Sequence, residues 1–354
     1  MRSPRFGIEH GCVLLTAIAF AAPASAQSQV VEEQLEVREV GVVADLPASL
    51  RGLSADELAA RLTILEGGIE RQPASVGTLG GPGSDAYGRV VVVLDRERCS
   101  PEIRIGATAA LGSKAAKLVA LGPTEIADLD GGLRPSGDAT RSAEELATRL
   151  AERSKEDCPV TSSAAGLDRA AFAAESLACP AGPCLLVWVG PGWGGDPAED
   201  GAPRPASRRE LEPLARDLAA GGWVFLAAPI TAADPTESQP SIPDVESQPG
   251  SDRHIFGVGV RGRGGRKPLT PEAYSRYVDV WLTPLRRLVA ATAGELVLKP
   301  DELAPALDAL AGRSVLWYRT DRRPDGAPAM LVVRAEGEHG RAYRVPQWVP
   351  PSRP

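Results

Sequence analysis

The spacing of apolar residues divides the chain into three regions. Between residues 30 and 80, apolar and polar positions alternate with period two, as around Val40, which predicts half-buried strands. The alternation slips by one residue at Glu39, where we expect a β-bulge. Residues 86–312 instead alternate short apolar runs with amphipathic segments, and residues 313–350 return to β-like runs. The pattern therefore predicts an α/β region between two β-rich flanks.

The central region has the pattern of a doubly wound, mostly parallel sheet with helices on both faces. Strands that are buried on both faces are continuously apolar, and Gly88–Asp95 fits this because four consecutive valines precede Leu94 and Asp95. We expect strands at 89–95, 125–130, 184–190, 222–228 and 295–298, and helices at 101–120, 143–154, 164–178, 207–220, 271–293 and 301–310. Residues 229–270 are rich in Pro, Ser and Gly, and we expect a flexible insertion there.

Neither flank is long enough to bury a hydrophobic core by itself. In the first flank, Leu62–Ile69 predicts a hairpin that turns at two glycines. The second flank contains three β-like runs, at 313–319, 329–335 and 341–349. We therefore expect residues 30–80 and 313–350 to pair into one small β domain into which the central region is inserted.

Residues 1–26 have the pattern of an export signal. Arg2 and Arg5 supply a positive start, Val13–Ala22 an apolar stretch, and Ala24-Ser25-Ala26 a cleavage site. No later run approaches 18 apolar residues, so no transmembrane segment is expected in the mature chain. The sequence predicts a protein that is exported and cleaved near Ala26, and it leaves open whether the mature protein is periplasmic or extracellular.

The charge and the histidine content exclude two classes of function. The formal net charge is −7, and cleavage removes Arg2, Arg5 and Glu9, which leaves −8. This surplus of acid argues against a general role in binding nucleic acid or anionic membranes. Only His254 and His339 remain in the mature chain, which excludes a histidine-rich zinc site.

Four cysteines remain after cleavage, and an even number in an oxidising compartment predicts disulfides. Cys99 follows a strand and is expected at the carboxyl edge of the sheet. Cys158 follows a helix, while Cys179 and Cys184 precede a strand, so these three are expected at the opposite edge. We expect one bridge among Cys158, Cys179 and Cys184, and the sequence does not decide which two of them pair. Cys99 is expected to be free.

The order of elements resembles the von Willebrand factor A family, and within it the secreted bacterial proteins of the VWFA-related type. Gly52–Leu58 and Leu62–Gly68 resemble the N-terminal β segment of these proteins. Leu288–Leu296 and Asp301–Asp308 resemble their closing helix–strand–helix, while Ser314–Tyr318, Asp325-Gly326 and Val345–Trp348 resemble their C-terminal strands. The resemblance implies a non-enzymatic protein that binds other proteins, in an adhesion or scaffold role.

The functional device of this family is a metal-ion-dependent adhesion site. Mg²⁺ there takes oxygen ligands from an Asp-x-Ser-x-Ser segment after the first strand, a threonine from a second loop and an aspartate from a third. In this chain Asp95 matches, but Glu97 and Cys99 stand in place of the two serines, and cysteine does not suit Mg²⁺. Arg96 and Arg98 also place positive charge close to the cation position.

The other two loops differ in how well they match. Asp138 and Thr140 could supply the second contribution, but the third loop begins at Gly190 with no aspartate at the strand end. The resemblance thus implies a degenerate site with no cofactor, in which Asp95, Glu97 and Thr140 are the vestigial candidates. We interpret Asp95 as a strand-end carboxylate that caps backbone amides, with a residual magnesium site as the alternative.

The remaining candidates belong to the expected interaction edge of the sheet. This edge comprises Asp95, Glu97, Asp138, Thr140, Trp193, Arg261 and Arg263. Trp193 lies among glycines in a loop and either covers the strand ends or anchors a partner. Arg261 and Arg263 belong to a locally basic part of the insertion, which is either solvated or binds an anionic surface. The expected partner is another protein or an envelope component.

A hydrolase is the alternative from a different functional class. Ser251-Asp252-Arg253-His254 contains the residue types of a catalytic triad. Neighbouring residues in a Pro/Gly-rich loop lack the rigid geometry and the oxyanion hole that this chemistry requires. We therefore expect a protein that is not an enzyme.

Overall fold

The computed structural model describes residues 38–46, 50, 53–80, 85–96, 101–129, 133–156, 179, 183–190, 192, 206–230, 282–322, 328–335, 346 and 348–349. All of these residues belong to one unit, Val37–Pro354. The expected export signal, the helix at 164–178 and most of the insertion at 229–270 lie outside the described residues. Within these ranges, no helix is both long enough and apolar enough to cross a membrane.

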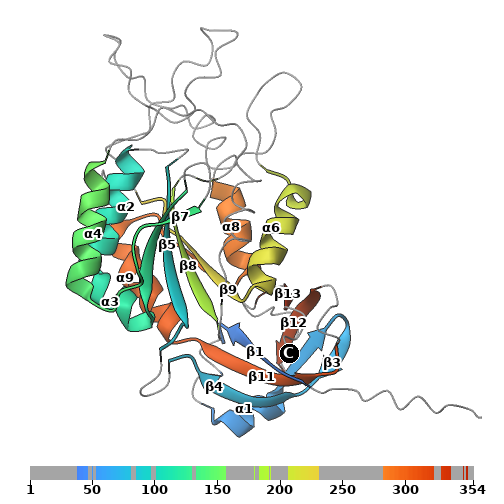
Figure 1. The fold of residues 1–354 in the computed structure, drawn as a ribbon. Coiled ribbons are helices and arrows are strands. Elements are labelled where there is room, and N and C mark those ends of the chain that lie inside the picture. Colours follow the sequence, from blue (N-terminus) through green and yellow to red (C-terminus); the bar gives the residue numbers. More distant parts are fainter. Residues whose placement is uncertain are drawn as a thin grey trace, which may run out of the picture. The chain divides into compact units, whose positions relative to one another are not determined.

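A six-stranded sheet occupies the middle of the described structure, with the strand order β10-β9-β8-β5-β6-β7 (Figure 1). Its strands are β5 (Arg89–Asp95), β6 (Thr124–Leu129), β7 (Leu133–Pro135), β8 (Cys184–Val189), β9 (Trp223–Ala227) and β10 (Glu295–Leu296). All neighbours are parallel except β7, which runs antiparallel to β6. The expectation of a mixed α/β fold with a mostly parallel sheet is confirmed, and the antiparallel edge strand β7 adds to it.

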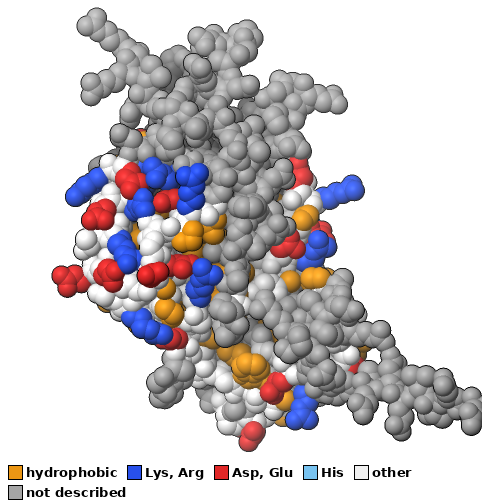
Figure 2. All heavy atoms as spheres, in the orientation of Figure 1, with side chains coloured by type: hydrophobic (Ala, Val, Ile, Leu, Met, Phe, Trp, Pro, Cys, Tyr) orange, Lys and Arg blue, Asp and Glu red, His pale blue; other side chains and the backbone are white. Residues whose placement is uncertain are grey.

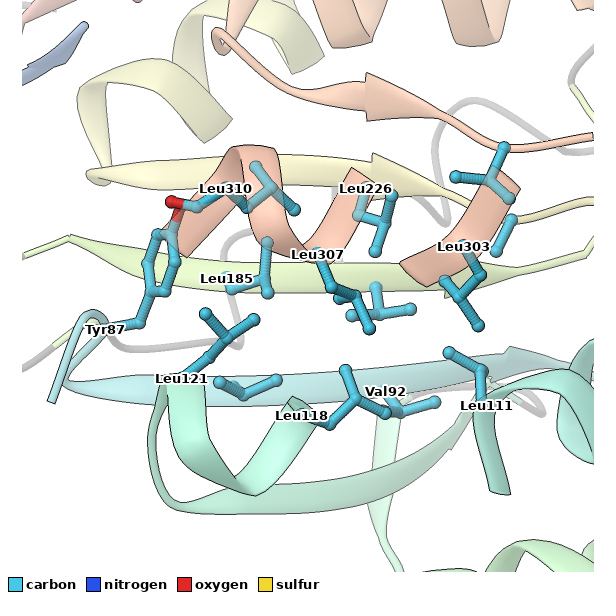
Figure 3. Packing of buried hydrophobic residues seen from close by; sticks show 14 of the residues in the cluster. Tyr87, Val92, Leu111, Leu118, Leu121, Leu185, Leu226, Leu303, Leu307 and Leu310 are labelled. Carbon is cyan, nitrogen blue, oxygen red and sulfur yellow. The ribbon is translucent and has the colours of Figure 1, made fainter. Parts of the chain in front are cut away.

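Helices cover both faces of this sheet. One face carries α2 (Pro101–Ser113), α3 (Ala115–Leu121), α4 (Ala143–Lys155) and α9 (Pro300–Ala311), and the other carries α6 (Arg208–Ala220) and α8 (Thr283–Ala291). Strand β5 serves both cores: Val92 packs on the first side and Val93 on the second. Figure 3 shows the first core, where Leu111, Leu118 and Leu307 surround Val92. Burial on both faces explains why β5 is continuously apolar.

The helix expected at 101–120 is two helices, so that prediction is wrong in one detail. The chain breaks at Lys114, whose φ of −116° and ψ of 17° depart from helical values. The amide of Lys114 donates to the carbonyl of Leu111 at 3.0 Å, which closes a tight turn between α2 and α3. All five predicted apolar positions are nevertheless buried, namely Ile103, Ala107, Ala110, Leu111 and Leu118.

Strands from the two flanks pair with each other in two antiparallel sheets, which we call the flank sheets. One has the order β1 (Arg38–Ala44), β11 (Ser314–Thr320), β4 (Pro73–Thr78). The other has the order β13 (Trp348–Val349), β12 (Ala329–Ala335), β2 (Leu62–Glu66), β3 (Ile69–Arg71). This is the pairing that the sequence analysis expects, whereas the boundary of a separate β domain stays a prediction.

Local details of the flank sheets follow the sequence in part. The hairpin between β2 and β3 is confirmed, and Gly67 and Gly68 have φ of 58° and 87°, values that favour glycine. The β-bulge expected at Glu39 is wrong, because the register of β1 with β11 is unbroken. The register shift lies between Trp317 and Tyr318, where β11 pairs with β4.

The first flank also contains a helix, α1 (Ala55–Arg61), where the sequence analysis assigned only β structure. Ser54 and Glu57 form a capping box, in which each side chain accepts from the backbone amide of the other residue. Leu58 of α1 is buried in a third core, which contains side chains from both flank sheets. The Ser-x-x-Glu spacing was the signal for this helix.

A buried carboxylate joins the two flank sheets. Glu66 of β2 is 2% exposed and accepts hydrogen bonds from the Tyr318 hydroxyl at 3.1 Å and the Thr320 hydroxyl at 2.6 Å, both on β11. The Arg322 Nη1 atom donates to the same carboxylate at 3.0 Å, and Arg71 Nε lies 3.7 Å from it. Several donors compensate for the desolvation of this charge.

A disulfide joins Cys179 and Cys184, with Cα atoms 5.9 Å apart. This confirms the prediction of one bridge within the set Cys158, Cys179 and Cys184. Cys184 begins β8 beside Arg89, at the amino edge of the sheet as expected. Cys158 and Cys99 lie outside the described residues.

Candidate functional site

The carboxyl ends of β5, β6 and β8, with the residues that follow them, form the candidate site, which we call the switch-point edge. β5 pairs with β6 on one side and with β8 on the other, so the chain direction across the sheet reverses at this strand. In open α/β sheets, ligands bind at the carboxyl edge where the strand order reverses. Asp95, the last residue of β5, lies at this point.

Asp95 is tightly enclosed at the end of its strand. It is 6% exposed, and Gly190, the residue after β8, lies directly against it. A Cβ atom built on Gly190 would lie 2.6 Å from the Cβ of Asp95, closer than side-chain carbons approach. The close packing of Asp95 therefore requires glycine at position 190, and an aspartate there would not fit without a shift of the strand ends.

A small cavity lies at the switch-point edge. Its volume is about 10 Å³, which is close to the minimum that one water molecule needs. Three acidic and three basic side chains line it, together with apolar residues of β5, α2 and β8. The charged residues are Asp95, Asp128 and Glu156, and Arg96, Arg104 and Arg153. The described lining is therefore balanced in formal charge.

Ion pairs connect these charged side chains across three elements. Arg153 of α4 places its Nη1 atom 3.2 Å from Asp128 Oδ2 on β6 and 2.7 Å from Glu156 Oε1. Arg96, directly after β5, places its Nη1 atom 2.9 Å from Glu156 Oε2. Each carboxylate oxygen of Glu156 is thus paired with one arginine. Figure 2 shows acidic and basic side chains interspersed over the surface of α2 and α4.

Thr140 and Asp138 lie at the opposite edge of the sheet from Asp95. Thr140 exchanges backbone hydrogen bonds with Thr124, the first residue of β6, at 2.9 and 2.7 Å. Thr124 pairs with Val90, five residues before Asp95, which corresponds to about 16 Å along the strand. Asp138 is exposed, and its carbonyl accepts from Arg149 at 2.7 Å. The structure therefore does not bring Thr140 or Asp138 to Asp95.

The role of Thr140 is to organise the start of α4. Its hydroxyl accepts from the amide of Ser142 at 3.0 Å and donates to the carboxylate of Glu145, which lowers the pKa of that carboxyl. Ser142 caps α4 by accepting from the amide of Glu145 at 3.2 Å. These contacts account for Thr140 without a metal.

Sequence reasoning did not identify Asp128, Arg153 and Glu156 as site residues. Asp128 is a charged residue near the end of the buried strand β6, which was a usable signal, because a charged residue in a buried strand needs a partner. Arg153 and Glu156 lie at the end of α4, and only the packing of that helix against α2 and α3 brings them to the edge. Glu97, Trp193, Arg261 and Arg263 lie outside the described residues.

The described residues of the switch-point edge do not fit a magnesium ion. Mg²⁺ requires near-octahedral oxygen ligands, whereas Thr140 lies at the far edge and Gly190 offers no side chain. The carboxylates of Asp128 and Glu156 are held by arginine, and a cation would have to displace these guanidinium groups. Among the described residues, no group of three or more His, Cys, Asp or Glu side chains is arranged to hold a metal ion.

No protein-family model matches the chain, and no curated protein matches it. Among solved structures, the chain is similar to an aerotolerance-related membrane protein from Bacteroides fragilis with multiple mutations to serine (10% identity, 62% of this chain and 98% of that chain covered, TM-score 0.33). It is also similar to a von Willebrand factor type A structure from Catenulispora acidiphila (11% identity, 88% of this chain and 72% of that chain covered, TM-score 0.30).

A third similar structure contains three N-terminal domains of the type V pilus tip protein Mfa5 from Porphyromonas gingivalis (13% identity, 53% of this chain and 32% of that chain covered, TM-score 0.23). All three TM-scores are below 0.5, so these similarities do not by themselves establish a shared function.

Proposed function

We propose that this chain is an exported, non-enzymatic protein-interaction protein. Its central region would be a von Willebrand factor A-like unit that has lost a complete metal site and binds a partner through the switch-point edge. Export is supported by the composition of residues 1–26. The A-like assignment is supported by the strand order and by the position of Asp95 at the end of β5.

The observation that carries this proposal is the arginine pairing of the acidic side chains at the switch-point edge. A divalent cation would neutralise carboxylates at this position, and here Arg96 and Arg153 neutralise Asp128 and Glu156. The edge is therefore charge-balanced without a metal. Arginine is enriched in protein interfaces, because its planar group makes several directed hydrogen bonds.

Site-specific photo-crosslinking tests whether a partner binds at this edge. A photoreactive amino acid replaces Ile105, which is 45% exposed in α2 close to the edge. The matched control replaces Glu144, which is exposed in the first turn of α4, near the opposite edge. In cells that produce the chain natively, we expect a discrete adduct from position 105 that persists in EDTA and is absent from position 144. If position 105 forms no specific adduct, the edge is not an interaction site.

A residual magnesium site is the alternative that the sequence left open, because Asp95 ends β5 at the switch point. A thermal melt of residues 27–354 in EDTA and then in millimolar Mg²⁺, Mn²⁺ or Ca²⁺ decides between the two. A metal bound only by the folded chain adds about 2.7 kcal/mol of stability at 100 times its Kd. We expect no shift. A shift that Asp95→Ala abolishes would establish the metal-dependent alternative.

The non-enzymatic part of the proposal has its own test. The purified mature chain is assayed against a panel of ester and peptide substrates, and we expect no turnover above buffer. Turnover that is lost in a His254→Ala variant would establish the hydrolase alternative instead.

A further inference from the structure

Glu156 occupies a position that is unfavourable for a carboxylate. It is the C-cap residue of α4 and directly follows the last helical residue, Lys155. The C-terminal end of a helix carries partial negative charge, which disfavours an acidic side chain there. The contacts that hold Glu156 in place are therefore those with Arg96 and Arg153.

Contacts that do not involve Glu156 position the guanidinium group of Arg153 and the backbone of Arg96. Arg153 also pairs with Asp128 Oδ2 at 3.2 Å and donates to the Ser136 hydroxyl. Arg96 extends the pairing of β5, because its amide donates to the carbonyl of Leu129 at 3.1 Å. The guanidinium group of Arg153 and the backbone of Arg96 would therefore stay in place if the carboxylate of Glu156 left, and groups that are already in place lose little entropy when they bind a new ligand.

The contacts of Glu156 are also of a kind that a competitor can replace. The side chain of Glu156 is 36% exposed, and those of Arg96 and Arg153 are 25% and 22% exposed. Ion pairs that are partly exposed contribute little to stability, because water screens them. By contrast, the side chain of Asp128 is 10% exposed and is held more deeply.

The charge balance at the edge changes when Glu156 leaves. With Glu156 in place, the three acidic and three basic side chains of the lining cancel. Without the carboxylate of Glu156, the lining carries one formal positive charge. This charge lies on arginines, whose guanidinium groups can bind a carboxylate by donating two parallel hydrogen bonds. An acidic side chain of another protein would restore the balance.

We propose that Arg96 and Arg153 form a carboxylate-binding pair, which Glu156 occupies in the free protein and an aspartate or glutamate of a partner protein occupies in the complex. Glu156 thus acts as an internal competitor at the interaction site. This inference rests on the proposed function, since it identifies the chemistry of the partner at the same edge.

Binding of a labelled hexaglutamate peptide tests this proposal, with a hexaglutamine peptide as the neutral probe. Fluorescence anisotropy at low salt compares the wild type with Glu156→Gln, which keeps the shape of the side chain and removes its charge. If Glu156 occupies the pair nine-tenths of the time, its removal strengthens binding on the order of tenfold. The gain should decrease with added salt, as screening requires, and hexaglutamine should show none.

The matched control is Asp85→Asn. Asp85 makes a bidentate ion pair with Arg141, at 2.7 and 2.6 Å, at the other end of α4. This variant removes one negative charge from the chain, as Glu156→Gln does, but at the opposite edge. We expect it to leave peptide binding unchanged, and we expect Arg96→Ala added to Glu156→Gln to abolish the gain.

The outcomes separate this inference from the proposed function. Unchanged or weaker binding by Glu156→Gln overturns the carboxylate-binding pair, even where the crosslink from position 105 persists. An equal gain from Asp85→Asn also overturns it, because net charge alone would then explain the effect. If Glu156→Gln binds hexaglutamate more tightly but position 105 forms no crosslink, the carboxylate-binding pair stands and the proposed interaction function of this edge is overturned.

Discussion

Glu66 provides a direct measure of how the two flank sheets are held together. Glu66→Ala removes a carboxylate that accepts from Tyr318, Thr320 and Arg322 and leaves three donors without an acceptor. Removing one partner of a buried ion pair costs about 3–5 kcal/mol. The side chain of Arg322 is 20% exposed and keeps some hydration, so we expect about 3–4 kcal/mol.

Differential scanning calorimetry is the suitable assay, because it separates transitions of different parts of the chain. For a chain of this size we expect the midpoint to fall by about 6–8 °C, at about 2 °C for each kcal/mol. If the flank sheets melt as a separate domain, only their transition should move. A single transition that moves as a whole would instead indicate one cooperative unit.

The matched control is Glu70→Ala on the neighbouring strand β3. Glu70 is exposed and pairs across from Leu65, so its truncation should change stability by less than about 0.5 kcal/mol. The reasoning is refuted if Glu66→Ala is as mild as this control. Such a result would mean that the apolar core of the flanks, rather than the buried carboxylate, determines their association.

Three further predictions concern other parts of the fold. Gly294→Ala should destabilise by more than about 3 kcal/mol in a urea titration, because its Cβ would lie 1.8 Å from the carbonyl oxygen of Phe225. Burial, with Glu66 nearby, raises the pKa of Tyr318 above its ordinary value of 10.0. The contribution of Tyr318 to stability is therefore full below pH 10.0 and is lost as the pH rises further. Alkaline unfolding followed by ultraviolet absorbance checks this. Reduction of the Cys179–Cys184 bridge, which closes a short loop, should lower stability by about 2 kcal/mol in the same titration.

Each of these has a control. Gly77→Ala should be tolerated, because no atom lies within 4 Å of its added Cβ. Tyr318→Phe should remove one tyrosine from the group that ionises only on unfolding, and a normal titration of Tyr318 in the folded chain would contradict the burial argument. A Cys179→Ser variant should lose as much stability as reduction does, since both open the same loop.

Elements with a strong local pattern were predictable from the sequence. The run Val90–Leu94 predicted a strand buried on both faces, and the structure has one at β5. Gly67-Gly68 predicted the β2–β3 hairpin, because few other residues adopt positive φ readily. Helix α1 was predictable as well, since Ser54 and Glu57 form a capping box, but the surrounding β-like alternation hid it.

The candidate site was predictable only in its first residue. Asp95 ends an unmistakable strand, so its place at the carboxyl edge follows from the sequence. The position of Thr140 does not follow, because the short antiparallel strand β7 returns the chain to the amino edge of β6 before α4 begins. A short strand at the edge of a sheet has little periodicity to detect, and here it moves the residues that precede α4 to the opposite edge of the sheet.

The sequence by itself determined the strands and helices that have a strong local pattern, because periodicity and capping act over a few residues. Only the tertiary structure decided which charged residues meet. Arg96 follows β5, Asp128 lies in β6 and Glu156 follows α4, and they are up to 60 positions apart. Their contacts depend on strand direction and on where a helix ends above the sheet. Both are properties of packing. In this chain, packing places arginines beside the carboxylates of an edge whose sequence resembles a metal site.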